Sequence, residues 1–151
     1  MPAQTAPHIR STTFDSMKQR TRQLLGFTLF VVFVLYSVSL VVATHLPRVP
    51  TVVRVPGADK LLHLVAYGCQ AILAMGTLYF MNRLILKNVV YLMIMLTIFG
   101  AIDELTQPFF SRQAELLDWV ADCAGVFFGA CSAYLVIHIR GEMKSRKKGS
   151  P

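Results

Sequence analysis

Four long apolar runs, separated by short polar or proline-rich segments, dominate the chain. They cover about residues 24–43, 61–80, 88–107 and 116–139. Each is close to the roughly 20 residues that a helix needs to cross the hydrocarbon core of a bilayer. Because every backbone polar group in lipid must be satisfied internally, such runs adopt helices. The pattern predicts an all-α, integral membrane four-helix bundle.

The first run has a rival interpretation as a cleaved signal peptide. Basic residues precede it, and Val41-x-Ala43 loosely resembles a cleavage site. The run is longer than an ordinary signal core, however, and three further apolar runs follow it. We therefore expect it to remain in the protein as the first membrane span.

The segments outside the runs divide the chain into a membrane domain and two tails. Residues 1–23 are polar and irregular, which predicts a disordered basic tail. Residues 24–139 form the membrane domain, and residues 140–151 form a basic C-terminal tail. Within the domain, three prolines make residues 44–59 an extended loop, and Asp59 is placed to cap the helix that follows.

Composition and charge support this picture and suggest an orientation. Of 151 residues, 54% are apolar and only 15% are charged, which is too apolar for a soluble domain. The N-terminal tail carries four Lys or Arg residues, the 81–88 loop two and the C-terminal tail five, against four in the other two loops. The bias places both ends and the 81–88 loop in the cytoplasm. Membrane orientation thus explains the net charge of +7, and no nucleic acid partner is expected.

Acidic residues gather on the opposite side of the predicted bundle. Six of the eight lie between residues 59 and 122, and ionisable groups within spans cost roughly 2.5–3.5 kcal/mol each. Spacing of four residues stacks several polar side chains on single helix faces, so the three later helices bring polar stripes to a similar depth. The candidate polar site comprises Asp59, Lys60, His63, Tyr67, Asp103, Glu104, Gln107, Arg112, Asp118 and Asp122.

Two interpretations of this site remain open. In the first, Lys60, His63 and Arg112 neutralise the acids and the cluster only fixes helix register. In the second, an outward-facing pocket handles a polar head group, an ion or a proton. Close carboxylates can supply an acid and a base, or hold a divalent cation. The candidate metal ligands are Asp103, Glu104, Asp118, Asp122 and His63.

No motif in the chain names a reaction. The metalloprotease, nucleophile-elbow and phosphate-loop patterns are absent, and the three cysteines have no zinc-binding spacing. Whether the protein is an enzyme, and which cofactor it uses, therefore stays open. Gly125 and Gly129 form a GxxxG pattern, which permits close helix packing and is expected to serve within the bundle. The oligomeric state is not determined by it.

Three sequence blocks, in order and with characteristic spacing, resemble the VanZ-like family of small bacterial membrane proteins. They are DKLLHLVAYG at 59–68, DELTQ at 103–107, and R-x5-D-x3-D-x2-G-x3-G from Arg112 to Gly129. THLPRVP after the first run also fits the family's first outer loop, and Asp122 stands where the family more often has Asn. The resemblance covers residues 24–139. It implies a multi-pass protein of the bacterial inner membrane, and the founding member is associated with low-level resistance to the glycopeptide teicoplanin.

The family defines no catalytic residues, so the resemblance adds motif positions and a cellular setting. The first functional hypothesis is that the site binds or processes an envelope lipid or a cell-wall precursor. The alternative is a non-enzymatic scaffold or partner subunit whose polar cluster is structural. Proton- or ion-coupled transport is a third hypothesis, which would require a four-helix unit to oligomerise.

Overall fold

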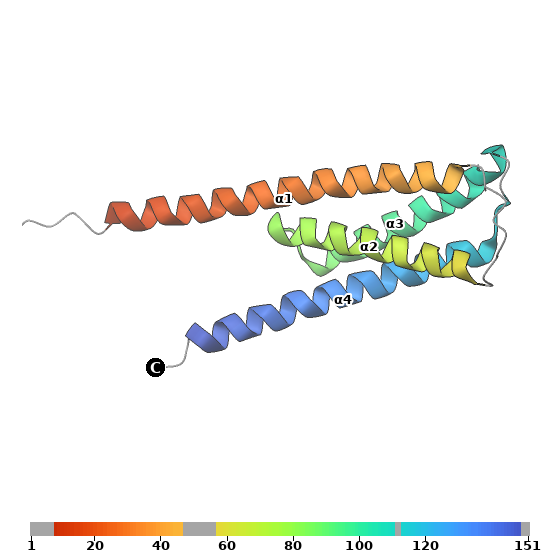
Figure 1. Cartoon of the computed structure of the whole chain (residues 1–151). Coiled ribbons are helices and arrows are strands. Elements are labelled where there is room, and N and C mark those ends of the chain that lie inside the picture. The colour runs from red at the N-terminus through yellow and green to blue at the C-terminus, as the bar shows by residue number, and fades with distance from the viewer. Residues whose placement is uncertain (1–7, 47–56, 111–112, 149–151) are drawn as a thin grey trace, which may run out of the picture.

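The computed structural model describes residues 8–46, 57–110 and 113–148, with side chains from residue 15 to residue 143 of those ranges. The described chain is helical apart from short connecting segments, and it contains no strand. Its elements are α1 (His8–His45), α2 (Ala58–Phe80), α3 (Leu86–Thr106), the short 3-10 helix η1 (Gln107–Phe110) and α4 (Leu116–Lys148). Figure 1 shows the four long helices running side by side, with the end of α1 and the starts of α2 and α4 at the same end of the bundle.

Four stretches within these helices are long and apolar enough to cross a membrane. They are Asp15–His45, Ala58–Phe80, Leu86–Phe110 and Leu116–Met143. At 1.5 Å rise per residue, even α2, with 23 residues, extends about 35 Å, slightly more than a hydrocarbon core. The all-α architecture with four membrane-spanning helices, predicted from the apolar runs, is confirmed.

The boundaries of α1 correct two details of the prediction. Helix α1 begins at His8, so the predicted disorder up to residue 23 is wrong from His8 onward; residues 1–7 lie outside the described chain. No Pro or Gly interrupts residues 8–23, and the helix continues through them from the apolar run. At its other end α1 includes Thr44 and His45, which had been assigned to a loop.

The start of α2 and the end of α4 also differ from expectation. Gly57, with φ of 80°, is the N-cap of α2, and no side chain caps the helix. Asp59 therefore lies in the first turn and does not cap it, contrary to the prediction. Helix α4 continues through the basic C-terminal segment as far as Lys148.

Helix α2 is the centre of the bundle, and it packs most closely against α4. At Gly125 an added Cβ would lie 2.3 Å from the Leu64 carbonyl oxygen, and at Gly129 it would lie 2.3 Å from that of Gly68. Any side chain at either position would therefore collide with the backbone of α2. The GxxxG glycines lie within the bundle and allow this helix pair to touch.

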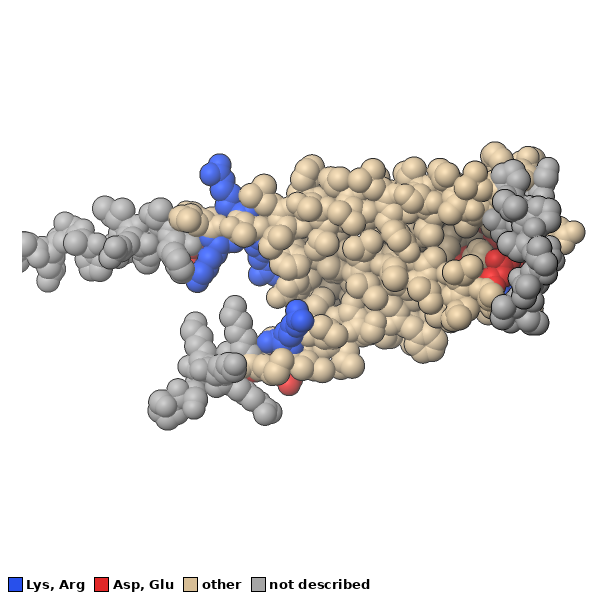
Figure 2. Space-filling model, in the orientation of Figure 1, with Lys and Arg blue, Asp and Glu red and all other residues tan. Residues whose placement is uncertain are grey.

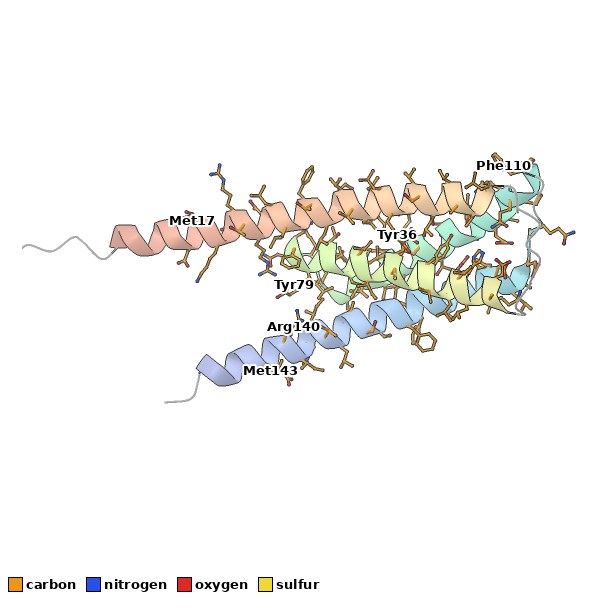
Figure 3. All side chains as sticks on the ribbon, in the orientation of Figure 1. Met17, Tyr36, Tyr79, Phe110, Arg140 and Met143 are labelled. Carbon is orange, nitrogen blue, oxygen red and sulfur yellow. The ribbon has the colours of Figure 1, made fainter. Side chains whose placement is uncertain are left out.

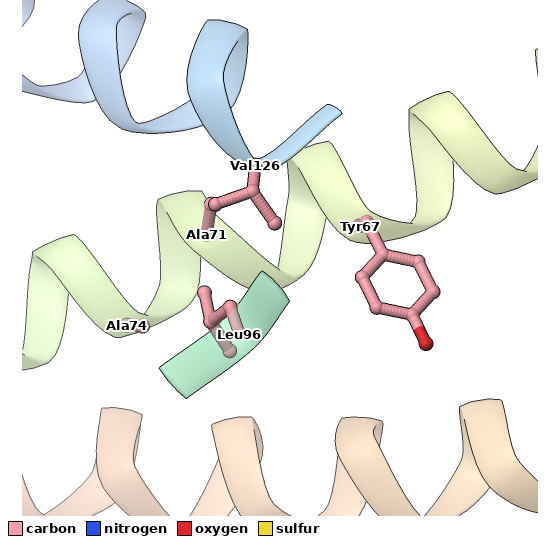
Figure 4. Packing of buried hydrophobic residues seen from close by; sticks show 5 residues of the cluster. All are labelled: Tyr67, Ala71, Ala74, Leu96 and Val126. Atoms are coloured by element: carbon pink, nitrogen blue, oxygen red, sulfur yellow. The ribbon is translucent and has the colours of Figure 1, made fainter. Parts of the chain in front are cut away.

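Polar and apolar residues are distributed in the manner of a membrane protein. In the core, small side chains such as those of Ala71, Ala74 and Val126 pack against Tyr67 and Leu96 (Figure 4). Among the described residues, eight polar or charged side chains are buried alongside eight apolar ones, while large apolar side chains are exposed along every helix. In water such a surface would be unfavourable, whereas in lipid it is the expected one. These features indicate a multi-pass membrane protein.

Charge separates along the long axis of the bundle. In Figure 2 the visible Lys and Arg side chains gather toward the end that carries the chain termini, and a group of acidic side chains lies at the opposite end. An uncharged belt separates them. We call the end that carries the chain termini the basic end. We call the opposite end, where α1 and η1 finish and where α2 and α4 begin, the acidic end. Figure 3 places Met17 and Arg140 toward the basic end, and Phe110 at the acidic end.

Candidate functional site

Buried polar side chains from α2, α3, η1 and α4 converge at the acidic end. The buried members are His63 of α2, Asp103 and Glu104 of α3, Gln107 of η1, and Asp118 and Asp122 of α4. Each lies within one to three turns of a helix terminus, because the apolar part of its helix must remain in the hydrocarbon. The result is a polar cluster at the acidic end of the bundle.

His63 joins α2 to α4. Its Nδ1 lies 2.9 Å from Asp122 Oδ1, and its Nε2 lies 3.9 Å from Asp118 Oδ2. Lys60, one turn earlier on α2, donates to Asp118 Oδ1 at 3.2 Å and to Glu115 Oε2 at 3.0 Å. The i, i+4 stripe predicted for α4 thus faces its basic counterparts on α2.

Asp103 is held by residues of α1 and α2. The Thr44 hydroxyl donates to Asp103 Oδ1 at 2.8 Å, and the Tyr67 hydroxyl donates to Oδ2 at 3.4 Å. His45 Nδ1 lies 3.5 Å from the same carboxylate, while His45 Nε2 lies 2.9 Å from the Thr106 hydroxyl. The end of α1 therefore contributes directly to the site.

Glu104 ties the end of α3 to the start of α4. Its Oε2 accepts a hydrogen bond from Gln107 Nε2 at 3.1 Å, and its Oε1 accepts one from the backbone N–H of Glu115. Gln107 is fully buried. Glu104 therefore fixes the connection between η1 and α4, and its role in this arrangement is local and structural.

Two buried acceptor atoms of the described cluster have no hydrogen-bond partner. They are Asp122 Oδ2 and Gln107 Oε1. Leaving such a group unsatisfied costs on the order of 1–3 kcal/mol, more when it is charged. Asp122 Oδ2 faces Gly100, where an added Cβ would lie 3.2 Å from it. The cluster thus retains hydrogen-bonding capacity that its own side chains do not use.

A pocket of 270 Å³ adjoins the cluster between α1 and α2. It is lined by both apolar and polar residues. Leu40, Ala43, Leu62 and Ala66 form what we call its apolar wall, and Thr44, Asp59, His63 and Tyr67 form its polar wall. This combination is suited to a molecule with both a polar group and a hydrocarbon portion.

Three potential metal ligands lie close together, and two of them, Asp59 and His63, belong to the polar wall. Ligand atoms of Asp59, His63 and Asp118 all lie within 4.8 Å of one another. Of the candidate ligands expected from the sequence, His63 and Asp118 belong to this group. Asp122 lies behind His63, whereas Asp103 and Glu104 bind other partners, so the structure does not bring these three into the group.

The structure brings together nine of the ten candidate site residues at the acidic end; the tenth, Arg112, lies outside the described residues. Sequence reasoning missed Thr44, His45, Thr106 and the side chain of Glu115. The signal for the first two was Pro47, since helices usually end at or before the residue that precedes a proline. By that rule the first helix could continue through Thr44 and His45, which lie just before Pro47.

The chain was also compared with known proteins. No protein-family model matches it, and neither the curated proteins nor the solved structures gave a match.

Proposed function

We propose that this chain is a VanZ-like protein of the bacterial inner membrane that binds or processes an envelope lipid or a lipid-linked cell-wall precursor. The three sequence blocks that resemble the family lie on α2, on α3 with η1, and on α4. Described residues of all three blocks contact one another at the acidic end, as in the pairs His63–Asp122 and Tyr67–Asp103. A shared spatial site is a reason for these separate blocks to occur together.

Charge supports an orientation with both termini in the cytoplasm. The segments at the basic end carry most of the Lys and Arg residues, which cytoplasmic loops favour. In that orientation the acidic end and its pocket open toward the cell envelope. A substrate from the outer leaflet would then reach the site without crossing the membrane.

The pocket between α1 and α2, which both apolar and polar residues line, is the observation that carries the proposal. A lipid could place its hydrocarbon portion along Leu40 and Leu62, within the spanning stretch of the bundle. Its head group would then meet Asp59 and His63 at the polar wall. Carboxylates and hydroxyls at that wall accept hydrogen bonds from sugar hydroxyls or amines, which are abundant in envelope lipids.

Lipid analysis of a deletion strain tests this function. Total membrane lipids and lipid-linked precursors are extracted from wild-type, deletion and complemented strains and quantified by mass spectrometry. We expect the amount of at least one polar lipid or precursor to change in the deletion strain and to recover on complementation. In a susceptible Gram-positive host, we also expect a change in teicoplanin susceptibility. Identical profiles in all three strains would contradict the proposal.

A second candidate function is that of a membrane scaffold or partner subunit with a structural polar cluster. The observation that favours it is the continuity of the hydrogen bonds, which join α1 to α3 through Thr44 and Asp103 and α2 to α4 through His63 and Asp122. Polar contacts of this kind hold membrane helices together. For a scaffold, site variants would lower the amount of protein but leave the phenotype per molecule unchanged.

A further inference from the structure

Asp59, His63 and Asp118 have the geometry of an incomplete metal-coordination shell. Asp59 and His63 are one turn apart at the start of α2, and Asp118 lies in the first turn of α4. Their ligand atoms lie within 4.8 Å of one another. Two ligands of a tetrahedral Zn²⁺ ion at about 2.1 Å stand about 3.4 Å apart. The 3.9 Å between His63 Nε2 and Asp118 Oδ2 is therefore close to the separation that coordination requires.

The environment of His63 is that of a metal-binding histidine. Metal-ligating imidazoles almost always donate their other ring N–H to a carboxylate or carbonyl, which fixes the ring and raises its basicity. His63 Nδ1 makes such a contact with Asp122 Oδ1 at 2.9 Å, and the imidazole is 6% exposed. With the Nδ1 proton donated to Asp122, Nε2 keeps its lone pair and faces Asp118. Nε2 makes no hydrogen bond to any described residue.

Asp118 is oriented in a comparable way. Lys60 donates to Asp118 Oδ1 at 3.2 Å, and this leaves Oδ2 directed toward His63. Lys60 is itself shared with Glu115 at 3.0 Å, so it does not neutralise Asp118 alone. In each of His63 and Asp118, one side-chain atom thus contacts a second residue. The other, Nε2 of His63 or Oδ2 of Asp118, faces its counterpart at 3.9 Å.

Space and charge at this point suit a cation. Asp59 and His63 line the 270 Å³ pocket, which leaves room for water or a ligand in the remaining coordination positions. The sequence segments of the acidic end contain six acidic residues and four Lys or Arg residues, which is an excess of negative charge. The four include Arg48, Arg54 and Arg112, which lie outside the described residues. A bound divalent cation would offset this excess.

We propose that Asp59, His63 and Asp118 bind a divalent transition-metal cation, Zn²⁺ or Mn²⁺, with Asp122 as the residue that positions His63. One imidazole and two carboxylates suit these ions better than Mg²⁺, which prefers oxygen ligands and retains its waters. The ion would give an otherwise acidic pocket a Lewis acid for an oxygen of the head group. Cation binding goes beyond the proposed function, because it is expected whether or not a lipid is present.

The test uses the full chain purified in detergent, stripped with chelator and titrated with Zn²⁺, Mn²⁺ or Mg²⁺ alone. Calorimetry and elemental analysis after dialysis should give one Zn²⁺ or Mn²⁺ ion per chain and weaker Mg²⁺ binding. His63→Ala and Asp118→Asn should each weaken binding at least about 100-fold, and Asp122→Asn about 10- to 100-fold. His138→Ala is the matched control, because His138 is exposed and its charged partner among the described residues is Glu142, at 3.5 Å. This variant should bind like wild type.

Lys60→Gln provides a readout that misfolding cannot imitate. The substitution removes a positive charge beside Asp118 but keeps a hydrogen-bond donor, so cation affinity should rise severalfold. Absence of stoichiometric Zn²⁺ and Mn²⁺ binding would overturn the proposal. Binding that is unchanged in both His63→Ala and Asp118→Asn would overturn it as well, since the ion would then occupy another place. Either result leaves the lipid profiles of the deletion strain to decide the proposed function separately.

Discussion

His63 Nδ1 lies 2.9 Å from Asp122 Oδ1, and both side chains are more than nine-tenths buried between α2 and α4. The contact joins the first and third of the sequence blocks that resemble the VanZ-like family. It also lies directly above the glycine contacts that bring the two helices together, with Gly125 one turn further along α4. The helix packing and the polar site are therefore parts of one arrangement.

The first prediction concerns the energetic coupling of this pair. His63→Ala and Asp122→Ala should each destabilise the protein by about 1–3 kcal/mol, because each leaves a buried polar partner unsatisfied. The double variant should lose clearly less than the sum of the two. Unfolding in mixed detergent micelles measures the free energies. The control is the same set of single and double variants at the exposed pair His138 and Glu142, 3.5 Å apart, which should show no measurable coupling. Strictly additive losses of unfolding free energy at His63 and Asp122 would contradict the buried contact.

The second prediction concerns the close approach of α2 and α4. Gly125→Ala should destabilise the fold by about 1–3 kcal/mol, because the added methyl group overlaps the Leu64 carbonyl and forces the helices apart. Gly141→Ala on the same helix is the control, since nothing lies within 4 Å of a Cβ there. Thermal unfolding in detergent compares the two. Equal midpoints for both variants would show that α2 and α4 do not meet at Gly125.

The third prediction tests the contribution of α1 to the site. Thr44→Val removes the hydroxyl that donates to Asp103 Oδ1 and should cost about 1 kcal/mol of unfolding free energy. Thr77→Val has the same change of side chain at a buried position, where the hydroxyl, among the described residues, bonds to Leu73 O of its own helix. The Thr44 variant should be the less stable of the two in the same unfolding assay. A larger loss for Thr77→Val would indicate that α1 does not contact Asp103.

The fourth prediction concerns orientation. In a variant without the three native cysteines, Arg112→Cys should react with a membrane-impermeant maleimide in intact spheroplasts. Met143→Cys, at an exposed position near the basic end of α4, should react only after the membrane is permeabilised. These results follow from the placement of Lys and Arg residues in the cytoplasm. Labelling of Met143→Cys, but not Arg112→Cys, in intact spheroplasts would reverse the orientation.

The apolar pattern was sufficient to predict the spans, and the reason is physical. Lipid permits few structures, so a run such as residues 61–80 has to be a helix, and α2 covers it. The beginning of α1 could not be found this way, because residues 8–23 are polar and their helix extends outside the apolar run. Hydropathy identifies where a helix crosses lipid, and it does not limit how far the helix continues in water.

The candidate site was predictable as a set of residues but not as a set of contacts. Burial of ionisable groups in a span is costly, so Asp103, Glu104 and Asp122 were recognisable from the sequence alone. Their partners depend on which helices lie side by side. Thr44 reaches Asp103 across 59 positions of the chain, and no local spacing could have indicated that pairing. The same holds for the grouping of Asp59 with Asp118, which arises only because α2 packs against α4.

The most direct test of the central claim compares lipid profiles at matched protein abundance. The deletion strain is complemented with wild type, His63→Ala or His138→Ala, and expression is adjusted until the membranes contain equal amounts of each protein. We predict that His63→Ala reproduces the lipid change of the deletion strain while His138→Ala restores the wild-type profile. A wild-type profile for His63→Ala at equal abundance would contradict a functional site at the acidic end and would leave the polar cluster a structural role.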